Sequence, residues 1–414
     1  MIKLQKLRNF FLILALGSVV ALVGFKVGES KTRAELGSSS GEKMDLSMMW
    51  QVKDRLNKLF LEKDKLKDQD MAYGAIEGMV AALGDPYTFY LPPKENKSAN
   101  EDLAGEFGGV GISLGYKDTN LAVMSPLPKS PAEKAGILAG DLILKISDKN
   151  KNIDKETTGL SLNEAVDLIR GKVGTDVTLK LYRDSKKDTF EVTLKRDNIV
   201  VPSLELVWKE QNGKKIAWVR LYKFTNQLFK EWTDVVGQIN NGKNSGNYGG
   251  IVLDLRNNPG GFLQASVMVA SDFLKDGIVV SQQSADGTKE DYLVDKTLGR
   301  LVNDKMVVLV NGGSASASEI LAGALKEYGR SKLVGEKTFG KGTVQQPQDF
   351  ADGSGLHVTI ARWLLPNGKN IHKVGVEPDV VVKYVPPLEA TISGKSANDL
   401  PDNQLDKAIE VLLK

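Results

Sequence analysis

The chain has 414 residues, a length that predicts more than one folded domain. Hydrophobic residues make up 41% of it and charged residues 26%, a balance typical of globular rather than disordered proteins. The net charge is only +3, so the strongly basic surface expected of a nucleic-acid-binding protein is missing. Cysteine is absent and the two histidines lie in separate segments, which excludes disulfides, thiol nucleophiles and the common zinc sites.

The N-terminal segment, residues 1–28, carries a basic flank followed by an uncharged run from Phe10 to Phe25. This layout is typical of a signal peptide or a short signal anchor. Because no small-x-small cleavage site follows the run, we expect an uncleaved single-pass membrane anchor with the folded part on the extracytoplasmic side. Cleavage would instead give a secreted protein. The polar, Ser/Gly-containing residues 29–43 predict a flexible linker.

Residues 44–102 are predicted to form an N-terminal helical region. Apolar residues recur at helical spacing from Met44 to about Leu83. The stretch "LGDPYTFYLPP" then ends the pattern, because glycine and proline break helices.

Residues 103–197 read as a small β-rich module. "GGVGISLGY" is a glycine turn leading into a strand, "SLNEAVDLIRG" is an amphipathic helix, and "DVTLKLYRD" and "TFEVTLKR" predict a hairpin. Together with "SPAEKAGILAGDLILKI", this order of elements resembles a PDZ domain. The resemblance implies that a substrate's C-terminal tail adds as a strand beside the helix at 161–170, with its carboxylate held by Gly109, Val110, Gly111 and Ile112. Arg170, at the end of that helix, is a further candidate for the peptide site, or for a contact with an acidic group of the domain that follows, formed only with peptide bound.

Residues 198–388 alternate strands with helices and predict an α/β domain. Near-continuous apolar runs such as "GIVLDL" and "MVVLV" suit parallel strands that are buried on both faces. Residues 389–414 form a C-terminal tail and helix; this helix and the region 44–83 are candidate elements of a homodimer.

Three polar loops follow these elements: "DLRNNPGG", "NGGSASAS" and "GEKTFGKGTVQ". A serine in the second loop is a candidate nucleophile, but a serine hydroxyl needs a base. His357 and His372 could each be structural. A lysine acts as a base only where burial lowers its pKa, and Lys341 is a candidate on that ground. Residue types alone leave this choice open.

The stretch "SASASEILAGALKEYGRSKLVGEKTFGKGTVQ" closely resembles the carboxyl-terminal processing proteases, a tail-specific family of serine peptidases with a Ser–Lys dyad. The resemblance implies Ser316 as nucleophile, Lys341 as general base and Gln345 as the residue that orients the lysine. Lys337 is not the base, and Ser314 and Ser318 are implied to be turn and helix-cap residues. The N–H groups of Ala317 and Gly261 are the implied oxyanion hole, and no metal or cofactor is needed.

The resemblance covers about residues 70–385 and includes "GAIEGMVAALGDPYTFYL" and "IVLDLRNNPGG". It implies a ClpP/crotonase-like protease core with an inserted PDZ domain, behind the helical segment and the membrane anchor. Asp254, Arg256 and Asn257 read as loop scaffolding.

The expected function is therefore a serine endopeptidase that cleaves proteins near their C-terminus. Two alternatives remain at this point. One is a membrane-tethered PDZ adaptor with an inactive protease-like domain, and the other is an acyl-transfer enzyme of the crotonase type.

Overall fold

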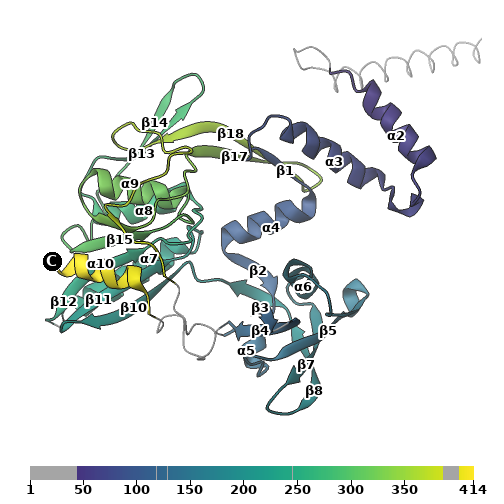
Figure 1. Cartoon of the computed structure of the whole chain (residues 1–414), viewed down its shortest axis with the longest axis horizontal. Coiled ribbons are helices and arrows are strands. Elements are labelled where there is room, and N and C mark those ends of the chain that lie inside the picture. Colours follow the sequence, from purple (N-terminus) through teal and green to yellow (C-terminus); the bar gives the residue numbers. More distant parts are fainter. Residues whose placement is uncertain (1–43, 118, 128, 245, 386–400) are drawn as a thin grey trace, which may run out of the picture. The chain divides into compact units, whose positions relative to one another are not determined.

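The computed structural model describes residues 44–117, 119–127, 129–244, 246–385 and 401–414 (Figure 1). The predicted anchor (1–28) and linker (29–43), and part of the predicted tail, lie outside the described residues. No helix among the described residues is long and apolar enough to cross a membrane. By its contacts the chain divides into residues 1–72 and residues 73–414, and each unit is taken by itself.

The N-terminal region contains α2 (Ser47–Leu59), a short 3₁₀ turn (Lys63–Lys65) and α3 (Asp68–Ala81). The expected helical pattern over 44–83 is therefore interrupted. Phe60 adopts an extended backbone that ends α2, and the charged stretch that follows has no apolar stripe to continue the helix.

The PDZ-like module is built on an antiparallel sheet in the order β3-β4-β5-β7-β8, with β6 paired to β5. Its predicted hairpin is present, because Asp176 of β7 pairs with Lys195 of β8 and the register continues to Arg183 and Asp188. The predicted helix is α6, which begins after a capping box between Ser161 and Glu164. The strands and helices of the module are β3 (Ile112–Lys117), β4 (Asn120–Pro126), α5 (Pro131–Lys134), β5 (Leu142–Asp148), β6 (Ile153–Glu156), α6 (Leu162–Ile169), β7 (Asp176–Arg183) and β8 (Asp188–Lys195).

A two-stranded ribbon brackets this module. Strands β2 (Glu106–Gly109) and β9 (Asp197–Val200) pair antiparallel, with Phe107 opposite Ile199. The chain thus enters and leaves the module side by side.

The larger α/β part has a six-stranded sheet in the order β10-β11-β12-β15-β16-β19, in which all neighbours except β10 and β11 run parallel. One face packs against α7, α8 and α9, and the other packs against α10. The apolar runs predicted to be buried strands are the central strands, and Met306–Val310 of β15 are all buried. The elements are β10 (Leu204–Gln211), β11 (Lys214–Leu221), α7 (Leu228–Lys243), β12 (Tyr248–Asp254), α8 (Leu263–Phe273), β15 (Met306–Val310), α9 (Ala317–Glu327), β16 (Lys332–Gly335), β19 (Val380–Val381) and α10 (Asn403–Leu413).

A second sheet is formed around the long strand β18 (Gly355–Leu364), which pairs with β1 (Phe89–Leu91), β13 (Ile278–Ser284) and β17 (Thr343–Asp349). Strand β14 (Lys289–Leu293) pairs with β13, and α4 (Pro93–Ala104) follows β1. Because β1 precedes the PDZ-like module in sequence, residues on both sides of the module belong to one sheet.

The described part is thus a mixed α/β fold with a PDZ-like module. The parallel strands β12, β15 and β16 end at the same edge of the sheet, so the loops that follow them meet there. These loops are the three polar loops singled out in the sequence. The finer expectation of a ClpP/crotonase-like core stays a prediction.

Candidate active site

Ser316 lies at the turn between β15 and α9, in a strained backbone conformation. Its φ is 55° and its ψ is −116°, a region that non-glycine residues rarely adopt. Such strain is found at sharp strand-to-helix turns that present a nucleophile. The serine is half-buried, and helix α9 begins directly after it.

The two flanking serines fix the turn, although neither caps the helix as expected, because the N-cap residue is Ser316 itself. Ser314 Oγ donates to the Leu255 carbonyl at 2.7 Å and accepts from Asn311 N at 3.0 Å. Ser318 lies inside α9, where its hydroxyl donates to the Asn258 carbonyl at 2.9 Å. Both hydroxyls therefore tie the serine loop to the loop after β12.

The glycines of the loop after β12 lie against Ser316. A Cβ on Gly260 would be 2.8 Å from Ser316 Cβ and 3.0 Å from Ala317 N, and its φ is +102°, so only glycine fits there. Gly261 pairs with Phe224 in an isolated parallel bridge. Among the described residues, the N–H groups of Gly261 and Ala317 donate to no protein acceptor. Both are therefore available to an outside acceptor.

A buried carboxylate joins the serine loop to the lysine loop. Glu319 of α9 is fully buried, and its Oε2 accepts from Ser316 N at 3.0 Å and from Lys341 N at 2.8 Å. Its Oε1 accepts from Gly340 N at 2.7 Å and from the Thr338 hydroxyl at 2.5 Å. The amides of Ser316 and Lys341 thus lie within hydrogen-bond distance of one oxygen atom.

Lys341 is half-buried, and no carboxylate of the described residues forms an ion pair with it. Burial lowers the pKa of its amine, while the Asp85 carboxylate partly opposes that shift. Its Nζ lies 5.3 Å from the centroid of the Tyr87 ring. This is the environment expected of a lysine that gives up its proton more readily than a surface lysine.

Gln345 is held by two threonines. Its Nε2 donates to Thr343 Oγ1 at 2.9 Å and to Thr359 Oγ1 at 3.2 Å. Its donor side is thus occupied, while its carboxamide oxygen accepts no hydrogen bond from the described residues. The implied contact with Lys341 is not made in this arrangement.

The remaining candidate bases differ in their surroundings. His357 of β18 stacks on Phe89 at 4.7 Å, and His372 meets the edge of Tyr87 at 5.9 Å. Burial lowers the pKa of both imidazoles. Lys337, in contrast, is an exposed residue whose Nζ pairs with Glu377 at 2.8 Å.

The loop residues read as scaffolding make structural contacts. Arg256 NH2 bridges Asp254 Oδ2 at 2.6 Å and Asp402 Oδ2 at 2.7 Å, which ties the loop after β12 to the start of α10. Asn257 and Asn311 exchange two hydrogen bonds of 2.9 Å. These contacts fit the predicted scaffolding role.

A separate groove of about 60 Å³ lies in the PDZ-like module, between β3 and α6. Strand β3 is the edge of its sheet, and Gly111 has a φ of +74°, so the turn before it depends on glycine. The Arg170 guanidinium stacks on Phe107 at 3.8 Å and forms no ion pair among the described residues. The groove is lined by Phe107, Gly109, Val110, Gly111, Ile112, Leu114, Val166, Ile169 and Arg170, which include all five residues predicted for the peptide site.

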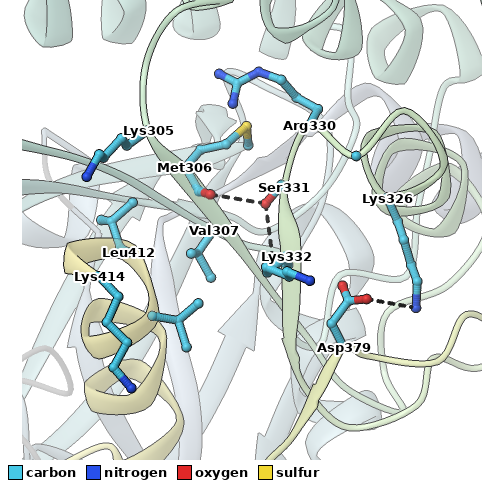
Figure 2. Close-up of a pocket in the computed structure, with 12 residues that line it drawn as sticks. Lys305, Met306, Val307, Lys326, Arg330, Ser331, Lys332, Asp379, Leu412 and Lys414 are labelled. Carbon is cyan, nitrogen blue, oxygen red and sulfur yellow. Dashed lines mark hydrogen bonds and ion pairs between the residues drawn. The ribbon is translucent and has the colours of Figure 1, made fainter.

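Figure 2 shows another cavity, of about 490 Å³, between the N-terminal ends of β15 and β16 and the end of α10. Its charges are partly neutralised, since Lys326 pairs with Asp379 at 3.4 Å. Neither Ser316 nor Lys341 lines it, so it is separate from the serine and lysine loops. No group of three or more His, Asp or Glu side chains that could hold a metal occurs in the described part of the chain.

Comparisons with known proteins identify the family of both the α/β part and the PDZ-like module. Residues 215–382 match peptidase family S41, and residues 108–194 match the PDZ domain. The chain is 36% identical to the carboxy-terminal processing protease CtpA of Bacillus subtilis over 406 residues, which cover 95% of this chain and 82% of that protein. It is 39% identical over 326 residues to a Staphylococcus aureus protein named "Probable CtpA-like serine protease", covering 78% of this chain and 62% of that one.

A crystal structure from Bacteroides fragilis, classed with the S41 proteases, shares the fold. It is 16% identical, covers 90% of this chain and 98% of that one, and has a TM-score of 0.55. Fold and sequence together define a serine peptidase of family S41 that carries a PDZ domain. The chain belongs to the carboxyl-terminal processing proteases.

Two features of this site were not found from the sequence. Glu319 was part of the quoted motif, but an acidic residue in the first turn of a helix usually needs no further explanation. Asp85 and Tyr87 lie more than 250 residues before Lys341, and only their place in "GDPYTFYL" marked them. The sheet pairing of β1 with β18 brings them to the lysine.

Proposed function

We propose that this chain is a serine endopeptidase that cleaves proteins near their C-terminus, with Ser316 as nucleophile and Lys341 as general base. The observation that carries the proposal is the shared Glu319 oxygen, which fixes the backbones of both residues. The strained turn at Ser316 and the burial of Lys341 support the two roles.

In the proposed reaction, the neutral Lys341 amine takes the proton of the Ser316 hydroxyl while Oγ forms a bond to the substrate carbonyl carbon. The proton then passes from Lys341 to the leaving amine as the C–N bond breaks. Water next attacks the acyl-enzyme, Lys341 takes its proton, and that proton returns to Ser316 Oγ when the ester bond breaks. Proton and electron pairs balance without a cofactor.

Negative charge on the carbonyl oxygen would be stabilised by the N–H groups of Ala317 and Gly261, which have no protein acceptor in the described residues. Gln345 is proposed to orient Lys341 through its carboxamide oxygen. That step needs the lysine to turn toward it, because the two side chains share no hydrogen bond in this structure.

The PDZ groove is proposed to bind the C-terminal tail of the substrate. The edge strand β3 offers unpaired backbone groups, and Arg170 offers a positive charge beside the glycine turn. A peptide with a free C-terminus should therefore bind more tightly than the same peptide with an amidated C-terminus. Equal affinity would reject carboxylate recognition.

Location and assembly are further proposals. The basic and apolar residues 1–28 support a single-pass anchor with the protease part outside the cytoplasm, or secretion if the segment is cleaved. The exposed apolar residues of α2, such as Trp50 and Leu59, support a homodimer.

The test uses the full-length chain with an unfolded protein substrate, and compares it with Ser316→Ala, Lys341→Ala and Lys337→Ala. Cleavage lost in the first two variants but kept in the third is expected. No cleavage by the wild type would favour the inactive PDZ adaptor. Equal cleavage by Ser316→Ala would reject the proposed nucleophile, and loss in Lys337→Ala with activity in Lys341→Ala would reject the proposed base.

A further inference from the structure

The segment Asp85–Thr88 packs against the lysine loop, although the proposed chemistry does not use it. The Tyr87 ring lies on one side of the Lys341 amine, with 5.3 Å between Nζ and the ring centroid. The same ring also meets His372 at 5.9 Å between centroids, with an interplanar angle of 70°. The half-buried Tyr87 ring is therefore in contact with both the lysine and the loop after β18.

Hydrogen bonds hold the backbone of this segment. The Asp85 carboxylate accepts from Tyr87 N at 3.1 Å and from Thr88 Oγ1 at 2.8 Å. Thr88 is itself buried, and its hydroxyl accepts from Thr359 N of β18 at 3.0 Å. Strand β1 then follows at once and pairs with β18, with Phe89 opposite His357. The backbone that carries the Tyr87 ring is therefore held in place beside β18.

Thr359 of β18 also contacts Gln345. The Thr359 hydroxyl accepts a hydrogen bond from Gln345 Nε2, and the Thr359 N–H donates to the Thr88 hydroxyl. The segment before β1 and the glutamine after the lysine are thus held by one residue of β18.

The titratable groups around Lys341 belong to four elements. Asp85 lies in this segment, His357 in β18 and His372 in the following loop, while Glu319 of α9 accepts the Lys341 backbone amide. Burial lowers the pKa of both histidines, so they are neutral at neutral pH. Burial also raises the pKa of the Asp85 carboxyl, but hydrogen bonds from Thr359, Thr88 and Tyr87 N outweigh this and keep it ionised. Asp85 is the carboxylate whose charge acts on the Lys341 amine.

We propose that Tyr87 is a positioning residue for the lysine base, whose ring shields the Lys341 amine from water, and that Asp85 anchors this ring and balances the charge of the amine. The inference rests on the proposed function, because it assigns a role relative to Lys341 as base. The ring, rather than the hydroxyl, carries this role, since the Tyr87 hydroxyl makes no hydrogen bond to the described residues.

The ring has two opposing effects on the amine. Shielding from water favours the neutral amine, whereas the π-face attracts an ammonium. Burial is the larger influence on Lys341, so opening the site to water should favour the charged form. Loss of the ring should then move the acidic limb of the kcat/KM profile to higher pH, while loss of the Asp85 charge should move it to lower pH.

The experiment measures kcat and KM against pH for the full-length wild type, Tyr87→Phe, Tyr87→Ala and Asp85→Asn, with Ser316→Ala as blank. Tyr87→Phe should stay within about twofold of the wild type. Tyr87→Ala should lose about tenfold or more in kcat, with KM within about threefold and the limb at least about half a pH unit higher. Asp85→Asn keeps the shape and an acceptor oxygen for Tyr87 N, with its NH₂ group at the position that faces the Thr88 hydroxyl, and should move the limb about half a unit lower.

Each other outcome decides against the proposal. An unshifted limb in Tyr87→Ala, or an equal loss in Tyr87→Phe, would overturn the role of the ring. If Tyr87→Ala does not fold, Asp85→Asn decides alone, and an unmoved or raised limb overturns the proposal. Failure of the proposed function is distinct from these results, because it appears as a wild type whose activity is absent or unchanged in Ser316→Ala.

Discussion

Replacing Glu319 by glutamine should both destabilise the protein and slow its proposed reaction. Each carboxylate oxygen faces two donors: Oε1 faces Thr338 Oγ1 and Gly340 N, and Oε2 faces Ser316 N and Lys341 N. Glutamine has the same shape but offers one acceptor oxygen and one NH₂ group. Whichever way the amide turns, its NH₂ group meets at least one backbone N–H.

The better of the two orientations places the NH₂ group at the Oε1 position. The Thr338 hydroxyl can then rotate to accept, but Gly340 N loses its acceptor, and a buried unsatisfied donor costs about 1–3 kcal/mol. The remaining bonds also weaken, because hydrogen bonds to a charged acceptor are about twice as strong as neutral ones. We expect Glu319→Gln to lower the free energy of unfolding by about 2–4 kcal/mol. Displacement of the Ser316 or Lys341 backbone should reduce kcat about tenfold to a hundredfold with little change in KM.

The assay combines denaturant unfolding with steady-state cleavage of one unfolded substrate. Glu327→Gln, at the exposed last residue of the same helix, is the matched control and should behave as the wild type. Wild-type stability together with wild-type kcat in Glu319→Gln would refute the idea that this carboxylate holds the two loops in place.

Three further predictions follow from the same contacts. Lys341→Met should abolish cleavage yet raise the free energy of unfolding at pH 7 by about 1 kcal/mol, because it removes a charge that burial disfavours. Lys337→Met, which removes one partner of an exposed ion pair, should change neither cleavage nor stability. A Lys341→Met protein less stable than the wild type would contradict the burial of the amine. Because burial lowers the pKa of Lys341 from 10.5, kcat/KM should fall about tenfold per unit of pH below that lowered value. The stability due to this group should decline as pH falls from about 10.5 to the lowered value. A kcat/KM profile with no acidic limb at any pH at which the protein stays folded would exclude a lysine base. Arg256→Ala leaves Asp254 and Asp402 without their shared cation and should lower the free energy of unfolding by about 3–5 kcal/mol. Helix α10 should then become sensitive to proteolysis. If α10 stays as protease-resistant as in the wild type, Arg256 does not anchor it.

Much of the fold could be predicted from local patterns. The apolar runs of β12 and β15 are buried on both faces, and periodicity marks such strands well. The hairpin of β7 and β8 and the helix α6 were predicted within a residue or two of their observed ends. The helical pattern over 44–83 was wrong in one respect, because spacing of apolar residues does not show that Phe60 is extended.

The site was harder to predict from the sequence, because contacts between residues far apart in the chain join its parts. Residue types left the base undecided between histidine and lysine, and the family resemblance selected Lys341. Of the predicted turn and helix-cap roles of Ser314 and Ser318, the turn role is confirmed for Ser314 and the helix-cap role is wrong, since Ser316 is the N-cap and both hydroxyls bond to carbonyls of a loop about 60 residues earlier in the chain. Glu319 and Tyr87 contact Lys341 only in the folded chain, and no local sequence pattern indicates these contacts.

The ribbon of β2 and β9 has a consequence for how such enzymes diversify. Since Phe107 lies opposite Ile199, the two ends of the recognition module are neighbours, and the chain could close across them with a short turn. A module attached in this way can be exchanged for another without rerouting the strands that carry the serine and the lysine. Under the proposed function, tail selectivity and bond-breaking chemistry can therefore change independently, and a chimera that carries a foreign PDZ domain between residues 105 and 201 is a practical way to redirect this protease.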